Sequence, residues 1–173
     1  MITSSRGLKI AYLGGVKSGK SRLAEAKALE LSGIERPYYL ATSEFTDDEM
    51  NERIEVHKIR RGTRFQTVEE PLKLYETVKQ CETPVLIDCL TVWMSNMLHH
   101  KNPEQDILSE ILSLFRLDQT IIMVQNEVGF GVIPENPLAR RFVDISGRVS
   151  QILGEQCDEL YFCSAGLQMA MKK

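Results

Sequence analysis

The sequence predicts an α/β protein in which a mostly parallel central sheet is flanked by helices. Short apolar runs that read as strands alternate along the chain with amphipathic runs that read as helices. A glycine-rich segment, GGVKSGKS, follows the first apolar run and opens the first helical run. No internal repeat or low-complexity stretch interrupts this alternation. We therefore expect a single domain over residues 1–173.

The composition narrows the class of protein. Of the 173 residues, 43% are hydrophobic and 26% are charged, as in an ordinary folded domain. The net charge of −3 argues against a nucleic-acid partner. The four cysteines form no C-x-x-C pair, so we expect reduced thiols rather than disulfides or a zinc site. No apolar run approaches the ~20 residues that span a bilayer, and the first residues lack a signal-peptide core, so we expect a cytoplasmic location.

The N-terminal half begins with a strand, a helix and a second strand. We expect these at 9–13, 21–31 and 36–41, and Gly33 acts as the stop signal of the helix. A polar turn follows the second strand, at the sheet edge where ligands bind in open α/β folds. A capping box from Thr46 to Glu49 then predicts a helix to about residue 60. One face of that helix carries Met50, Ile54, His57 and Arg61.

The remaining elements follow the same periodicities. Residues 62–67 read as a turn with at most a short extended piece, and Pro71 opens a helix to about residue 79. Three further strands are expected at 84–88, 120–125 and 159–163. Three further helices are expected at 91–98, at 104–115 and from 136 onward. The total is five strands, and their order in the sheet does not follow from the sequence.

The segment from Gly14 to Ser21 fits the pattern G-x-x-x-x-G-K-[ST] between a strand and a helix, which is the context of a P-loop. Its backbone N–H groups and the helix N-terminus would bind phosphates. Lys20 would reach the β- and γ-phosphates, and the Ser21 hydroxyl would bind Mg²⁺. The alternative is a glycine turn with a chance Lys-Ser pair, which the flanking strand and helix disfavour.

Two further residues are candidates for chemistry. Asp88 ends an apolar strand, as a Walker-B-like carboxylate that could hold Mg²⁺ does. His57 lies among Arg53, Lys58, Arg60 and Arg61, cations that would keep the imidazole neutral and nucleophilic and would bind a triphosphate. On the residues alone, a structural helix histidine is the commoner interpretation of His57. We expect the histidines at 99 and 100 to lie in an exposed loop.

Several blocks, in this order and spacing, resemble one known family. They are GGVKSGKS at 14–21, ATS at 41–43, DDEM…RI…HK at 47–58, NEVG…GVIPEN at 126–136 and LAR…DI…GRV at 138–149. The chain is similar over nearly its whole length to the bifunctional adenosylcobinamide kinase / adenosylcobinamide-phosphate guanylyltransferase of the cobalamin nucleotide-loop pathway. The P-loop block at 14–21 occurs in many protein families. The blocks at 47–58 and 126–136 are specific to this family.

The resemblance implies a RecA-like P-loop fold, a homotrimer and two reactions. In the first, ATP or GTP phosphorylates the aminopropanol hydroxyl of adenosylcobinamide. In the second, a histidine attacks the α-phosphate of GTP, and adenosylcobinamide phosphate then takes the GMP. The histidine that matches here is His57, and the resemblance overrides the structural interpretation of it.

The same resemblance implies the site residues. Lys20 joins His57 as a catalytic residue, and Ser21 with Asp88 holds Mg²⁺. Glu69 would bind either guanine or ribose, and the sequence does not decide between them. The nucleotide-binding positions are Gly14, Gly15, Val16, Lys17, Ser18, Gly19, Lys20, Ser21, Ala41, Thr42, Ser43, Lys58, Ile59, Arg60, Arg61, Glu69 and Asp88.

Three positions depart from the pattern that the resemblance leads us to expect. Lys17 stands where we expect Arg, and Lys cannot bind phosphate bidentately. Val56 stands where some relatives have a second histidine. Asp88 stands where Glu could, which shortens the reach to Mg²⁺.

Two alternative functions stay open. One is a P-loop kinase without a covalent step. The other is a RecA-like ATPase acting on nucleic acid or protein, which the acidic net charge disfavours.

Overall fold

The structure of the protein, a computed structural model, describes residues 6–44, 59 and 62–173. The helix that we predicted over residues 46–60 lies outside these described residues, apart from Ile59. So do four of the predicted site residues, namely His57, Lys58, Arg60 and Arg61.

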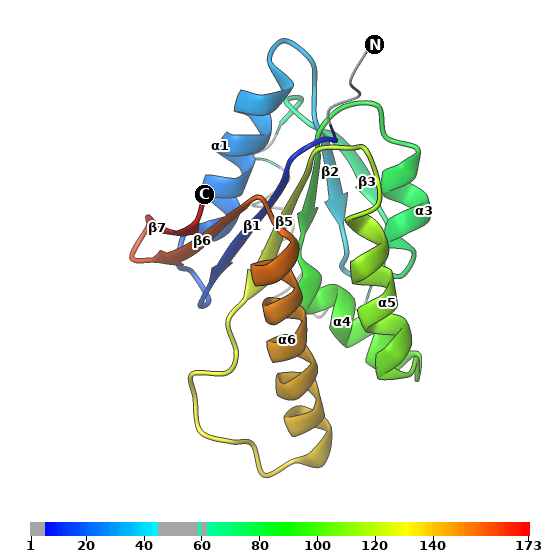
Figure 1. Cartoon of the computed structure of the whole chain (residues 1–173), viewed down its shortest axis with the longest axis vertical. Coiled ribbons are helices and arrows are strands. Elements are labelled where there is room, and N and C mark those ends of the chain that lie inside the picture. The colour runs from blue at the N-terminus through cyan, green and yellow to red at the C-terminus, as the bar shows by residue number, and fades with distance from the viewer. Residues whose placement is uncertain (1–5, 45–58, 60–61) are drawn as a thin grey trace.

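The described part of the chain forms a seven-stranded sheet in the order β3-β2-β4-β5-β1-β6-β7 (Figure 1). Six strands are parallel, and β7 runs antiparallel to β6 at one edge. The predicted class, a mostly parallel sheet, is therefore confirmed. The strands are β1 (Lys9–Gly14), β2 (Tyr38–Ala41), β3 (Gln66–Glu69), β4 (Val85–Asp88), β5 (Ile121–Asn126), β6 (Glu159–Ser164) and β7 (Leu167–Lys172).

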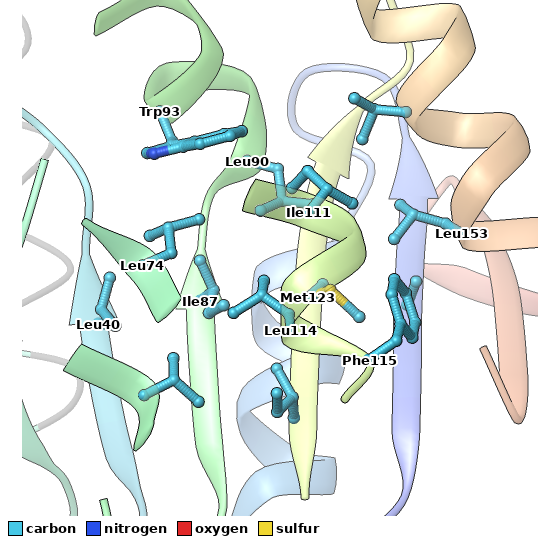
Figure 2. Close-up of a cluster of buried hydrophobic side chains, with 14 of the residues drawn as sticks. Leu40, Leu74, Ile87, Leu90, Trp93, Ile111, Leu114, Phe115, Met123 and Leu153 are labelled. Carbon is cyan, nitrogen blue, oxygen red and sulfur yellow. The ribbon is translucent and has the colours of Figure 1, made fainter. Parts of the chain in front are cut away.

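Helices cover both faces of the sheet (Figure 1). On one face, α1 packs Ala24 and Ala28 against β1, β4 and β5. On the other face lies a larger core, part of which is shown in Figure 2. It includes the fully buried Trp93, whose indole N–H donates to the carbonyl of Leu72. The described helices are α1 (Lys20–Ser32), α3 (Leu74–Lys79), α4 (Leu90–His99), α5 (Glu104–Leu114) and α6 (Pro137–Gln156).

Two strands exceed the five that we predicted. The short edge strand β3 alternates half-buried with exposed residues and carries only one apolar side chain, so its apolar signal is weak. We expected the strand at 159–163 to be the last one, but Ala165 and Gly166 both have positive φ (52° and 79°) and turn the chain back into β7. Positive φ at both central residues is typical of a two-residue hairpin turn.

One helix begins later than predicted. The helix that we expected to open at Pro71 starts at Leu74. The carboxylate of Glu70 accepts hydrogen bonds from the backbone N–H groups of Leu72 and Lys73, both at 2.8 Å. These bonds form a turn that precedes the first helical residue.

A buried lysine ties the amino end of β1 to the loop before β5. Lys9 is fully buried, and its Nζ donates to the carbonyl oxygens of Gly7 (3.0 Å), Leu117 (2.9 Å) and Gln119 (2.7 Å). Removal from water lowers the pKa of Lys9 from its ordinary value. The three carbonyls satisfy all the donors of the ammonium group, which makes its burial tolerable.

We predict that Lys9→Met lowers the free energy of unfolding by roughly 2–4 kcal/mol, because three partly buried carbonyls lose a charged donor. Urea denaturation followed by circular dichroism measures this change. The exposed Lys73→Met is the matched control and should stay within about 0.5 kcal/mol of wild type. Equal stability of the two variants would show that the buried ammonium contributes nothing.

Candidate nucleotide-binding site

The predicted P-loop connects β1 to α1. Gly14 is the last residue of β1, and Lys20 is the first of α1. Lys17 and Gly19 have positive φ, 56° and 94°, so the backbone curls tightly before the helix begins. The P-loop sequence thus adopts the strand–loop–helix geometry in which backbone N–H groups and a helix N-terminus face an anion.

Neighbouring strands hold the P-loop backbone from both sides. The N–H of Glu127, just after β5, donates to the carbonyl of Gly14, and the N–H of Gly166, in the β6–β7 turn, donates to the carbonyl of Ser18, both at 2.9 Å. A Cβ on Gly14 would lie 2.4 Å from the Cys163 carbonyl oxygen, and one on Gly19 would lie 2.9 Å from the Gly166 Cα. Glycine is therefore required at both positions by the close approach of β6 and its hairpin turn.

Lys20 and Ser18 place polar atoms inside this cradle. Lys20 is 7% exposed, and its Nζ donates to the carbonyl of Gly15 at 2.9 Å. Burial lowers the pKa of Lys20, although the nearby Asp88 opposes this shift. The buried Ser18 hydroxyl has no hydrogen-bond partner among the described residues. A buried hydroxyl without a partner in a P-loop fits a site whose missing acceptor is a phosphate oxygen.

Ser21 and Asp88 converge at the mouth of the P-loop. The Ser21 Oγ lies 3.4 Å from Asp88 Oδ1, while the Tyr39 hydroxyl donates to Asp88 Oδ2 at 2.7 Å. Hydroxyl and carboxylate oxygens are ligands that Mg²⁺ prefers, so this donor set fits the ion. The sequence analysis did not identify Tyr39, because a tyrosine in a buried strand is usually a core residue. Its hydrogen bond to Asp88 depends on the register between β2 and β4, which the sequence does not give.

The strand register brings two more predicted residues to the same edge. Ala41, at the end of β2, pairs with Glu69 of β3 and with Asp88 of β4. Glu69 is exposed and Ser43 is half-buried. Within the P-loop, Gly15 is half-buried, while Val16 and Lys17 are exposed. Ile59, the one described residue among the predicted contacts at 58–61, is exposed.

Thr42 has a different place from the other predicted contacts. It is fully buried, its hydroxyl donates to the Cys89 carbonyl at 2.9 Å and accepts from the Cys89 N–H at 3.1 Å, and its carbonyl accepts from Asn96 at 2.6 Å. These bonds fix the turn after β2 against the start of α4. The side chain of Thr42 therefore positions its neighbours instead of facing the edge.

Other features concern chemistry away from this edge. The four cysteines are buried and unbridged, and burial raises the pKa of the Cys89 thiol to about 11. Within the described residues, no three His, Cys, Asp or Glu side chains gather as metal ligands. No helix in that same part of the chain has the length and apolarity to cross a membrane.

Solved structures share this fold at low sequence identity. The flagellar accessory protein FlaH from Methanocaldococcus jannaschii matches with a TM-score of 0.50 and 14% identity, covering 97% of this chain and 79% of that one. A solved ATPase domain matches with a TM-score of 0.52 and 13% identity, covering 91% of this chain and 69% of that one. These likenesses confirm the predicted P-loop fold and carry no argument about substrate.

Relatives that are similar over nearly their whole length are more informative. The bifunctional adenosylcobalamin biosynthesis protein CobP of Pseudomonas aeruginosa is 42% identical over 168 residues, covering 92% of this chain and 95% of that one. The CobU proteins of Escherichia coli and Salmonella typhimurium are 38% and 34% identical, each covering 95% of this chain and 100% of the relative. The sequence model of the cobinamide kinase / cobinamide phosphate guanyltransferase family matches residues 10–171. The resemblance seen in the sequence is thus confirmed, and the chain belongs to the cobinamide kinase / cobinamide phosphate guanyltransferase family.

Proposed function

We propose that this chain catalyses two consecutive group transfers of cobalamin biosynthesis. In the first, the γ-phosphoryl group of ATP or GTP passes to the aminopropanol hydroxyl of adenosylcobinamide, and a nucleoside diphosphate leaves. In the second, His57 attacks the α-phosphate of GTP and pyrophosphate leaves; the phosphate of adenosylcobinamide phosphate then displaces the histidine to give adenosylcobinamide-GDP. The family match over residues 10–171 is the observation that carries this proposal.

The geometry of the P-loop supports a triphosphate ligand. Lys20 has a desolvated ammonium group whose hydrogen bond to Gly15 can be exchanged for phosphate oxygens. The unpartnered Ser18 hydroxyl and the curled backbone supply neutral donors in the same loop. Charge that develops on the transferring phosphoryl group would be stabilised by donors that are already in place. Such stabilisation is the main source of rate enhancement in phosphoryl transfer.

Mg²⁺ would be held by Ser21 and Asp88, whose oxygens converge 3.4 Å apart. The ion, when bound, would neutralise phosphate charge. The Tyr39 hydroxyl, bonded to the second carboxylate oxygen, holds the Asp88 side chain so that its first oxygen stays turned to Ser21.

The nucleoside would extend from the P-loop along the edge where Ala41 and Glu69 end their strands, with Ser43 just beyond β2. The backbone around Thr42 is fixed by its bonds to Cys89 and Asn96, so it can present rigid hydrogen-bonding groups to a base or ribose. Lys58, Ile59, Arg60 and Arg61 complete the proposed nucleotide site beside His57. We further propose that residues 1–173 act as one domain, in the cytoplasm, as a homotrimer without a nucleic-acid partner.

We predict that the protein becomes covalently labelled by α-labelled GTP in the absence of any corrinoid. The label should be acid-labile and alkali-stable, as expected for a phosphoramidate on histidine. His57→Ala should lose it, whereas His99→Ala, at the exposed end of α4, should keep it. No label on wild type, or a label that persists in His57→Ala, would favour the alternative of a small-molecule P-loop kinase without a covalent step.

We predict that Asp88→Asn raises the Mg²⁺ concentration for half-maximal kinase rate by about tenfold or more, because it removes a negative charge from the ion's ligands. Titration of the initial rate with Mg²⁺ measures this shift. Glu35→Gln removes a carboxylate charge from the opposite edge of the sheet and should leave the titration unchanged. An Asp88→Asn curve superimposed on that of wild type would remove Asp88 from the Mg²⁺ site.

We predict a mass in solution of three times the 19.7 kDa chain mass. Gel filtration with light scattering measures this mass directly, independent of molecular shape. A monomeric mass at micromolar concentration would contradict the homotrimer.

A further inference from the structure

An exposed apolar segment lies between β5 and α6. In it, Phe130 is 82% exposed, Val132 95% and Ile133 78%. Single exposed apolar side chains are common, but several within four residues of one loop form a surface that water hydrates poorly. Such a surface on a folded protein marks a place where a ligand or another molecule binds.

The same segment forms one wall of a pocket whose other wall is the start of α6. The pocket has a volume of about 120 Å³ and is lined by residues 128–134, except Phe130, and by Arg140, Val143 and Asp144. The Arg140 guanidinium donates to the carbonyls of Pro134 (2.9 Å) and Glu135 (2.6 Å), which fixes the loop against the helix. A Cβ at Gly131 would meet no described atom within 4 Å, so a flat ligand has open access to the backbone there.

The lining combines apolar side chains with a few polar groups. Valine, isoleucine and proline side chains suit methyl groups, and the Asp144 carboxylate can accept from an amide N–H. A corrin is a broad macrocycle that carries methyl groups and amide side chains on its rim. The pocket is large enough for part of that rim and too small for the whole ring, so the ring would lie over the exposed segment.

The position of the segment relative to the P-loop favours this ligand. The segment leaves the sheet from Asn126, which pairs with Gly14, and the N–H of Glu127 is bonded to the Gly14 carbonyl at 2.9 Å. A molecule bound at the β5 end of residues 128–134 therefore lies near the phosphate cradle, where an acceptor hydroxyl must arrive for transfer.

The apolar surface continues onto β6 and β7. The Phe130 ring lies 5.9 Å from the Phe162 ring, centroid to centroid. Phe162 pairs with Met169, so both side chains lie on the same face of the sheet, and Met169 is exposed. The surface thus extends beyond the pocket, as a ligand wider than the pocket requires.

We propose that residues 128–134 and the first turns of α6 bind the corrin macrocycle of adenosylcobinamide and its phosphate. This inference rests on the proposed function and assigns the acceptor subsite of the same reactions. The nucleotide binds on one side of Gly14 and Asn126, and the corrin binds on the other.

The test compares Val132→Asp with Ile34→Asp, which introduces the same charge at a fully exposed apolar residue in the loop between α1 and β2. Equilibrium dialysis against adenosylcobinamide gives the Kd, and the α-labelled GTP reaction gives the nucleotide step without corrinoid. We expect Val132→Asp to raise the Kd roughly ten- to a hundredfold. The variant loses the valine side chain that the ligand would bury, and binding would remove the new carboxylate from water. Ile34→Asp should bind as wild type does, and both variants should label with GTP.

The outcomes separate this inference from the proposed function. In one outcome, wild type is labelled by GTP and binds the corrinoid, and neither Val132→Asp nor the milder Val132→Ser changes the Kd. This result would overturn the corrin subsite and leave the proposed function intact. Loss of the oligomeric mass in Val132→Asp would overturn it too, because the surface would then be an interface between copies of the chain. Wild type that neither labels nor binds corrinoid would overturn the proposed function and this inference together.

Discussion

The P-loop backbone is held between the carboxyl ends of two strands, and the rest of the site depends on that constraint. Two backbone hydrogen bonds, from Glu127 to Gly14 and from Gly166 to Ser18, fix the loop at both ends. The approach is so close that Gly14 and Gly19 leave no room for a side chain. A loop pinned in this way keeps its N–H groups directed at one point without a ligand, so little order has to be gained when phosphate binds.

The charged groups of the site depend on the same packing. Lys20 starts α1 directly after the pinned loop, which places its ammonium group in a desolvated position beside Gly15. Asp88 comes from a strand that does not touch β1, because β5 lies between them. Its carboxylate is nevertheless turned to Ser21 by the bond from Tyr39. Electrostatic interactions among these groups are strengthened by the low polarity of the surrounding core.

The strands that pin the loop also lead into the apolar surface beside it. β5 continues into the exposed segment 128–134, and β6 turns into β7 at the residue that contacts Ser18. The Phe130 ring, in the segment after β5, packs beside the Phe162 ring of β6, so the two parts form one surface. A polar phosphate cradle and an apolar surface therefore share one support, which suits an enzyme that joins a nucleotide to a large acceptor with both methyl and amide groups.

The sequence by itself determined the elements whose signals are local: the P-loop with its flanking strand and helix, the buried strands at 84–88 and 120–125, and the start of α6 near residue 136. Each of these depends on residues within a few positions of one another, where spacing and composition directly limit the backbone. The resemblance to the family, including the assignment of His57, came from the order of short blocks along the chain.

The tertiary structure alone decided the strand order, the weakly apolar edge strand β3, the hairpin that holds Ser18, the role of Tyr39 beside Asp88 and the buried position of Thr42. These features join residues that are tens of positions apart, and their geometry is set by the register between strands. Many registers satisfy the same apolar pattern, and only the packing of the whole sheet with its helices selects one.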